Sequence, residues 1–183
     1  MALSGQLLIA MPGMDDPRFA QSVIYLCAHT EDGAMGLVLN RPIARPSFGE
    51  ILEQLQIDPS EPAREIPLCA GGPVEHGRGF VLHSADWQSE ETLEIDETHS
   101  MTASLDILRA VATGEGPQRC VLALGYAGWD AGQLDGEIQN NIWLTAPSDD
   151  EILFDSDFAT KWRRALGRLG IDPGALSGQA GRA

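Results

Sequence analysis

Cysteine and histidine are the residue types in this sequence that could support nucleophilic chemistry. Cys27 and His29 lie two residues apart in an apolar segment, and strand alternation predicts that they share one face, about 7 Å apart. A thiol is activated by a base within about 3 Å, so this pair is too widely spaced for direct activation. His83 is a second candidate base, which would have to come from a distant strand. These residues leave open an enzyme that acts on a small anionic substrate through Cys27 or His83.

A glycine-rich segment, Gly125–Gln133, could instead bind a ligand through its backbone. It follows a predicted strand and opens a predicted helix, and helix N-termini bind anions. It lacks the lysine and hydroxyl of a P-loop and the glycine spacing of a dinucleotide-binding turn. Either Gly125, Tyr126 and Gly128 allow a ligand or partner to approach, with Trp129 as a lid, or the glycines only permit a tight turn.

A polar stripe follows on the next predicted helix. Gln133, Glu137 and Asn141 are spaced i, i+4 and i+8, so they share one helix face. Such a stripe could line a pocket beside the glycine-rich segment, or it could be an ordinary solvated face. Both interpretations stay open.

Two further segments contribute candidate binding residues. Asn40 and Arg41 end a predicted strand, and Arg41 could anchor an anion or form a structural salt bridge. The residues Gly71, Gly72 and Pro73 predict a sharp turn before a strand that carries Arg78 and His83. Alternation places Arg78 and His83 on opposite faces of that strand, and His83 is expected to be a hydrogen-bonded sheet histidine.

The spacing of potential ligands predicts no metal site and no cofactor. His76 and His83 are seven residues apart without a partner motif, and the cysteines form no C-x-x-C pair. The acidic run at 148–157 lacks the spacing of a calcium-binding loop, and carboxylates at a helix start explain it.

The charge balance disfavours direct nucleic-acid binding. The chain of 183 residues carries 27 acidic and 12 basic side chains, giving a net charge of -15. Phosphate backbones repel such a chain unless its basic residues cluster. The nearest cluster, Lys161, Arg163, Arg164 and Arg168, is small and falls on one predicted helix.

The cysteine count and the lack of export features point to the cytosol. Cys27, Cys69 and Cys120 each lie in an apolar run, which favours buried, reduced thiols over a disulfide framework. The N-terminal segment has no basic region, and no apolar stretch approaches the length of a membrane span. We therefore expect a cytoplasmic protein without membrane contact.

Hydrophobic periodicity predicts an α+β fold with a mixed, largely antiparallel sheet. A helix is expected to start at the Ser47–Glu50 capping box and to end before Pro59. A single domain is expected over 1–173, followed by a frayed glycine- and alanine-rich tail over 174–183. The predicted strands are 7–11, 22–29, 34–40, 66–70, 78–84, 91–95, 119–126 and 142–145, and the other predicted helices are 102–113, 131–140 and 157–169.

Several of these segments together resemble the AlgH/YqgE family. The resemblance rests on LIAMP (8–12), SVIYLCAH (22–29), GAMGLVLNRP (33–42), GGPV (71–74), RGFVLH (78–83) and GYAGW (125–129), which continues to WL (143–144). It implies a bacterial cytosolic α+β protein whose sheet is folded into a barrel-like shape. Family members carry the name of transcriptional regulators, but the resemblance implies no established activity and no recognised DNA-binding motif.

The leading hypothesis is a non-enzymatic binding or regulatory module for an unknown protein or small-molecule ligand. The alternatives are the Cys27/His83 enzyme and a transcriptional regulator, for which direct DNA binding is disfavoured by the charge. The candidate binding surface comprises Asn40, Arg41, Gly71, Gly72, Pro73, Arg78, His83, Gly125, Tyr126, Gly128, Trp129, Gln133, Glu137 and Asn141.

Overall fold

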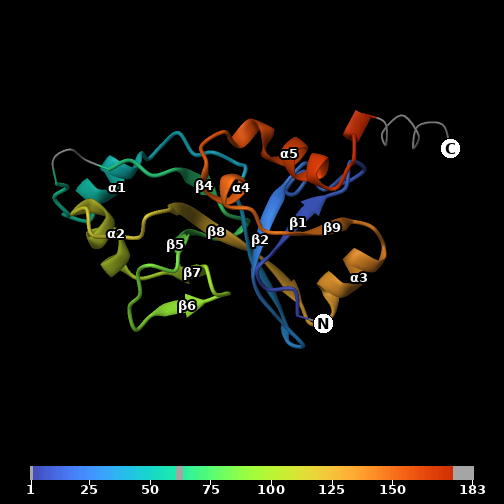
Figure 1. Cartoon of the computed structure of the whole chain (residues 1–183), viewed down its shortest axis with the longest axis horizontal. Coiled ribbons are helices and arrows are strands. Elements are labelled where there is room, and N and C mark those ends of the chain that lie inside the picture. The colour runs from blue at the N-terminus through green and yellow to red at the C-terminus, as the bar shows by residue number, and fades with distance from the viewer. Residues whose placement is uncertain (1, 61–63, 175–183) are drawn as a thin grey trace.

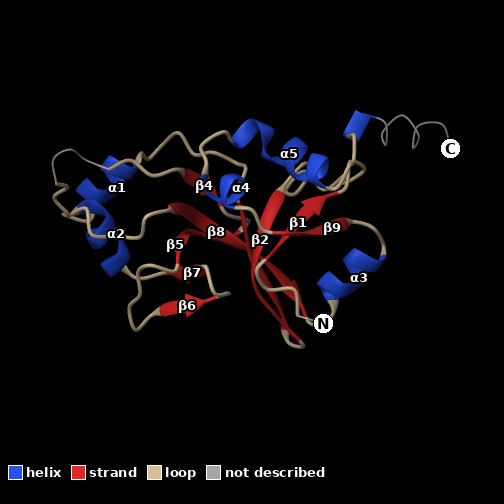
Figure 2. Cartoon of the chain, in the orientation of Figure 1, coloured by secondary structure: helices blue, strands red, loops and turns tan. Residues whose placement is uncertain are grey.

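The computed structural model describes residues 2–60 and 64–174 and is an α+β structure around one nine-stranded sheet (Figures 1 and 2). The sheet has the order β6-β7-β5-β8-β3-β2-β1-β9, with β4 paired in parallel beside β8. The prediction of a largely antiparallel sheet curled into a barrel-like shape is confirmed, since the sheet forms a half-barrel. Its strands are β1 (Gln6–Ala10), β2 (Val23–Thr30), β3 (Gly33–Val38), β4 (Leu68–Ala70), β5 (Val74–Ser84), β6 (Thr92–Glu94), β7 (His99–Thr102), β8 (Cys120–Asp130) and β9 (Trp143–Pro147).

The helices lie around the sheet. The edge strands of the sheet are β6 and β9. In Figure 1, α1 and α2 lie together at one end, α4 and α5 along one side, and α3 beside β9 at the other end. The helices are α1 (Phe48–Gln54), α2 (Leu105–Ala112), α3 (Gln133–Gln139), α4 (Asp150–Phe154) and α5 (Lys161–Arg168), with a 3₁₀ turn η1 (Phe158–Thr160) before α5.

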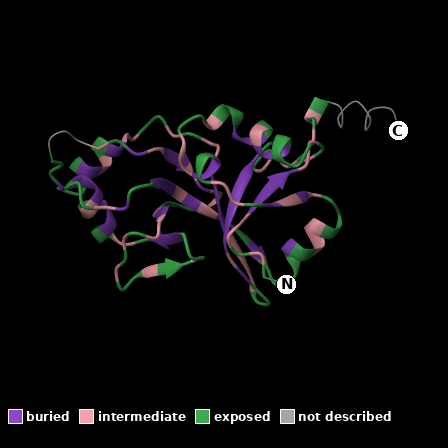
Figure 3. Cartoon of the chain, viewed as in Figure 1, coloured by how far each residue is buried: buried purple, intermediate pink, exposed green. Residues whose placement is uncertain are grey.

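Burial on both faces explains the continuous apolar runs of the N-terminal strands (Figure 3). Leu7 and Ile9 of β1 face a core closed by α4 and α5, whereas Leu8 and Ala10 face a core closed by α3. A third core fills the space between α1, α2 and the strands β5 and β8. Helix α3 is therefore held against the sheet on the face opposite α4 and α5.

Strand β8 joins the two halves of the sheet. Its residues 120–126 pair with β5 and β4, and its residues 127–130 pair with β3. Close to the change of partner, Gly125 has a φ of +81°, in the left-handed region that favours glycine. The predicted end of this strand at 126 is therefore wrong, because pairing with β3 extends the strand to Asp130.

The chain crosses β8 closely at the turn before β5. A Cβ on Gly71 would lie 2.3 Å from the Gly125 carbonyl oxygen, and one on Gly72 would lie 2.1 Å from the Tyr126 carbonyl carbon. Only glycine permits this approach of two backbones. The three glycines thus permit the close crossing of these two segments.

Two elements near the C-terminal half differ from the prediction. Thr102 ends β7 and does not start a helix, because it pairs with Val81 and its hydroxyl lies 2.8 Å from His83 Nε2. Helix α4 was not predicted; the Asp149 carboxylate caps it by accepting from the backbone N–H groups of Glu151 and Ile152. The predicted helix over 157–169 is η1 followed by α5. Apart from Gly174, the expected tail lies outside the described residues.

Candidate functional site

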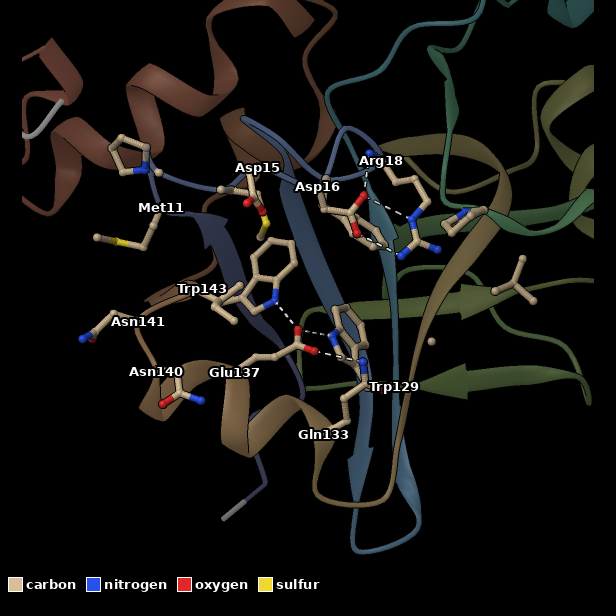
Figure 4. Close-up of a pocket in the computed structure, with 18 residues that line it drawn as sticks. Met11, Asp15, Asp16, Arg18, Trp129, Gln133, Glu137, Asn140, Asn141 and Trp143 are labelled. Carbon is tan, nitrogen blue, oxygen red and sulfur yellow. Dashed lines mark hydrogen bonds and ion pairs between the residues drawn. The ribbon is translucent and has the colours of Figure 1, made fainter. Parts of the chain in front are cut away.

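The candidate site is a cavity of about 1060 Å³ between helix α3 and the connection from β1 to β2 (Figure 4). The connection supplies residues 11–16, 18 and 19, and the helix side supplies Gln133, Glu137, Asn140 and Asn141. Trp129 of β8 and Trp143 of β9 form the wall between them. The cavity thus combines an aromatic wall with polar side chains from separate elements.

Glu137 fixes the aromatic wall. Its Oε1 accepts from the indole Nε1–H of Trp143 at 2.9 Å and from that of Trp129 at 3.2 Å. Its Oε2 accepts from the Gln133 side-chain amide at 2.9 Å. Both indoles are buried, and buried indole N–H groups need a partner. The predicted polar stripe therefore faces the cavity at Gln133 and Glu137 and is not merely a solvated face.

Edge-to-face contacts order the aromatic rings. The rings of Trp129 and Trp143 have centroids 6.1 Å apart with an interplanar angle of 80°, and Phe19 meets Trp143 at 5.8 Å and 69°. Such T-shaped pairs add to the stabilisation from burial. Phe19 comes from the β1–β2 connection, so this packing links the two sides of the cavity.

Asn40 and Arg41 hold the β1–β2 connection in place. The Asn40 amide accepts from the Val23 N–H at 2.9 Å and donates to the Gln21 carbonyl at 2.8 Å. The Arg41 guanidinium donates to the carbonyls of Ala20 and Pro17. Both residues line a separate hollow of about 250 Å³ and do not line the main cavity. Their contacts position the segment that does.

A second hollow of about 680 Å³ shares part of the wall of the cavity. Val74, Gly128 and Trp129 line both hollows, and Arg78 and Tyr126 line only the second. The Arg78 guanidinium lies over the Phe80 ring, 5.0 Å from its centroid, and pairs with Glu75 at 3.5 Å. Arg78 is thus beside the candidate cavity without being part of it.

Of the remaining predicted residues, Pro73 lines the cavity and the others do not. Gly71, Gly72 and Gly125 instead allow the close crossing of the two backbone segments described above. His83 is buried on the face toward α2, where its Nε2 meets the Thr102 hydroxyl and its Nδ1 lies 2.8 Å from the Ser84 carbonyl. Burial lowers the pKa of His83, which fits the expected hydrogen-bonded sheet histidine.

The cysteine–histidine pairs are not brought together. A β-bulge between Leu26 and Ala28 breaks the alternation, so the prediction that Cys27 and His29 share a face is wrong. Cys27 lies in the core closed by α4 and α5, whereas His29 contacts Asp135 of α3 at 3.1 Å. His83 faces the core of α1 and α2, since its ring packs against Trp87.

The three thiols are free and buried. Burial raises the pKa of Cys27, raises that of Cys69 to about 12 and raises that of Cys120 to about 11. A thiol with such a pKa forms little of the thiolate that acts as a nucleophile at neutral pH. The geometry therefore gives no support to Cys27 as an activated nucleophile.

The basic cluster on α5 is largely neutralised. Lys161 is fully buried, Arg164 pairs with Asp155 at 2.8 Å, and Arg168 pairs with Asp149. Among the residues that the structure describes, no group of three or more His, Cys, Asp or Glu is placed to hold a metal ion. Within the same residues, no helix has the length and apolarity that a membrane crossing requires.

Sequence reasoning missed two parts of the cavity. The hydrophobic pattern places Trp143 in a strand and gives it no functional role, and it predicts no element for the segment that contains Asp15 and Phe19. One signal in the sequence could have indicated the role of Trp143: it follows Glu137 by six residues, just after the predicted helix ends. Nothing local indicated that residues 11–19 would fold over α3, because that placement depends on long-range contacts of Asn40 and Arg41.

The fold and the cavity define a class: an α+β protein whose curled antiparallel sheet carries an aromatic-walled cavity beside α3. The sequence matches the family model described as AlgH-like over residues 7–174, so the chain belongs to the AlgH-like family. The resemblance seen in the sequence motifs is therefore confirmed.

Relatives and solved structures agree with this assignment. A UPF0301 protein of Rhodospirillum rubrum is 55% identical over 181 residues, covering 99% of this chain and 94% of the relative. A UPF0301 protein of Gluconobacter oxydans is 51% identical over 185 residues, covering 100% and 99%. The solution structure of the AlgH protein from Pseudomonas aeruginosa is similar with a TM-score of 0.78 and 47% identity, covering 97% of this chain and 94% of that one. A Corynebacterium diphtheriae protein, DIP2367, shares the fold at a TM-score of 0.73 and 23% identity, covering 91% and 86%.

Proposed function

We infer that the chain is a non-enzymatic binding module of the cytosol, whose cavity beside α3 receives a small ligand or a side chain of a partner protein. One observation carries this proposal: two indoles that line the cavity are held by a single carboxylate of α3. The exposed amide side chains of Gln133, Asn140 and Asn141 line the same cavity. A concave site with aromatic lining and a few placed polar groups is the usual form of a ligand site.

The cytosolic part of the proposal rests on the thiols. All three cysteines are free and buried, which fits a reducing compartment. Separation of cell fractions with an antibody to the chain tests it, and recovery from the periplasm would contradict it.

The enzyme alternative requires a reactive nucleophile. We expect a thiol reagent to label Cys27, Cys69 and Cys120 slowly in the folded protein, because each thiol is buried and its pKa is raised. In urea all three should react at once, which provides the control. Rapid labelling of Cys27 at neutral pH would favour the enzyme over the binding module.

Direct DNA binding is the weaker regulatory candidate. Arg163 is the exposed cation of the α5 cluster that forms no ion pair with another described residue, and the chain carries a net charge of -15. A regulatory role would therefore act through a ligand or a partner protein. Saturable binding to duplex DNA at low salt, which weakens with added salt, would contradict this preference.

The binding proposal is tested by a fragment screen read out on the four tryptophan indole N–H signals in ¹H–¹⁵N spectra. Ligands of the cavity should shift the signals of Trp129 and Trp143. The signals of Trp87 and Trp162 should stay in place, because neither lines the cavity. A diverse screen in which no compound moves the two cavity indoles would refute the site.

A further inference from the structure

The cavity has an excess of negative side chains. Asp15, Asp16 and Glu137 line it, and its one cationic side chain is Arg18. Arg18 binds both carboxylate oxygens of Asp16, at 3.2 and 2.9 Å. Within the described residues, Asp15 and Glu137 have no cationic partner. An anion entering the cavity would meet two uncompensated carboxylates.

Three hydrogen bonds fix the direction of the Glu137 carboxylate, which can still accept a further hydrogen bond. A carboxylate has about four acceptor positions, and Glu137 uses three of them for two indoles and one amide. The donors are neutral, so the charge of the carboxylate is not cancelled. The remaining position on Oε2 is available to a charged donor, and charge-assisted hydrogen bonds are the stronger kind.

Asp15 and Glu137 lie on opposite sides of the Trp143 indole in the view of Figure 4. Asp15 comes from the β1–β2 connection and is exposed, whereas Glu137 comes from α3. Aromatic rings attract cations through their faces and also cover apolar stems. A group bound against this wall would thus meet carboxylates from two separate elements.

We propose that the cavity takes an organic cation: an ammonium, amidinium or guanidinium group carried on a flat or apolar stem. This proposal rests on the binding function proposed above and narrows it to a class of ligand. It opposes the small anionic substrate considered from the sequence, since the cavity lacks an unpaired cation to hold one. The cation is either a free small amine or a lysine or arginine side chain of a partner.

The test compares three probes of one shape and different charge: benzamidine, benzamide and benzoate. Each is titrated at low ionic strength while the Trp129 and Trp143 indole signals are followed. Benzamidine should bind about tenfold more tightly than benzamide, because charged donors add to the same ring contact, and benzoate should bind most weakly. Added salt should weaken benzamidine binding and leave benzamide binding unchanged.

A pair of matched variants locates the charge effect. Asp15→Asn removes one carboxylate from the cavity and should lower the affinity for benzamidine about fivefold while leaving benzamide unaffected. Asp58→Asn changes the net charge equally on an exposed loop outside the cavity and should have no effect. Equal losses in both variants would show a general charge effect and would overturn the assignment to this cavity.

Other outcomes separate this inference from the binding function itself. If benzamide or benzoate shifts the two indoles at concentrations where benzamidine does not, the cation class is wrong and the binding site stands. If no probe and no fragment shifts them, both proposals fail. Agmatine and a short peptide with one arginine then distinguish the sources: tighter agmatine binding supports a free amine, and tighter peptide binding supports a partner's side chain.

Discussion

At the residue scale, Glu137 links the stability of the protein to the shape of its cavity. Two indole N–H groups and one amide depend on its two oxygens. We expect Glu137→Gln to lower the free energy of unfolding by about 1–3 kcal/mol, because one of the two oxygens becomes an NH2 group. That group would face either the Gln133 amide or both indole N–H groups, depending on the orientation of the new amide. Urea denaturation measures this change, and the Trp129 and Trp143 indole signals should shift with it.

The control for this prediction is Glu53→Gln on α1, which makes the same chemical change at an exposed carboxylate. It should alter the free energy of unfolding by no more than about 0.5 kcal/mol. Equal stability of the two variants would mean that the hydrogen bonds of Glu137 contribute nothing net.

Lys161, the single lysine of the chain, makes stability depend on pH. Its ammonium is buried and has no hydrogen-bond partner among the described residues, and it lies 4.8 Å from the Phe158 ring centroid and 3.9 Å from Asp155 Oδ1. Burial lowers its pKa from 10.5 to about 8. Below pH 8 both the folded and the unfolded chain carry the proton, so the desolvation cost is fully present. Between pH 8 and 10.5 the folded chain loses the proton first, and the cost is relieved as the pH rises.

We therefore expect Lys161→Met to stabilise the protein most at pH 7, by about 3 kcal/mol at most, with the advantage shrinking toward pH 10.5. Chemical denaturation of the parent protein and of Lys161→Met across this pH range measures the difference in the free energy of unfolding. The titration of the cysteines affects both proteins equally and therefore cancels in this difference. Arg163→Met on the same helix should give a difference that does not vary with pH, because that side chain is exposed. A Lys161→Met advantage that grows with pH would contradict the assignment.

The sequence revealed some of these residues and concealed others for a physical reason. Helical spacing found Gln133 and Glu137, since a period of 3.6 residues is a local property. It did not find Trp143 or Asp15, because they reach the cavity through packing of β9 and of the β1–β2 connection. The prediction that Cys27 and His29 share a face of the sheet was wrong, because a β-bulge interrupts the alternation between them. Nothing in the local sequence of this strand indicates the bulge.

At the element scale, the apolar strands were predictable and the short elements were not. Strands β1, β2 and β3 are buried on both faces and read as continuous apolar runs, so their positions follow from composition. Strand β7 was not predicted, its last residue, Thr102, was assigned to a helix, and α4 was not predicted. Each depends on partners far along the chain, and His99 of β7 contacts Asp150 of α4 at 2.6 Å. Tertiary contacts decided these elements against local propensity.

The turn before β5 gives the prediction that belongs to this scale. In Gly72→Ala the added Cβ would lie 2.1 Å from the Tyr126 carbonyl carbon, which is backbone, and Tyr126 is paired with Val74 of β5. We expect a loss of at least about 3 kcal/mol in the free energy of unfolding. Thermal and urea denaturation measure it, and the yield of soluble protein replaces them if the variant does not fold.

The matched control is Gly77→Ala, five residues further along, where nothing lies within 4 Å of the added Cβ. This variant should keep the stability of the parent protein within about 0.5 kcal/mol. A Gly72→Ala protein as stable as Gly77→Ala would show that the close crossing is not what requires glycine. In that case the alternative from the sequence, that the glycines allow a ligand or partner to approach the backbone, would be favoured.

At the scale of the whole molecule, the net charge of -15 should limit stability at low salt. Four of the ten ion pairs among the described residues join largely exposed side chains, so these four contribute little to offset the repulsion among the acidic residues. Salt screens attraction and repulsion alike, but with 27 acidic and 12 basic side chains the repulsion is the larger sum. Raising sodium chloride from about 10 to 150 mM shortens the screening length from about 30 to 8 Å.

The melting temperature should therefore rise over this range, by about 2–4 °C for each kcal/mol of repulsion removed. Potassium chloride should give the same rise at equal ionic strength, because screening does not depend on the identity of the cation. A rise with one salt alone would indicate a bound ion. A fall with both would mean that the ion pairs, such as Arg164 with Asp155 beside α5, outweigh the repulsion of the surface. Differential scanning calorimetry with both salts separates these three cases.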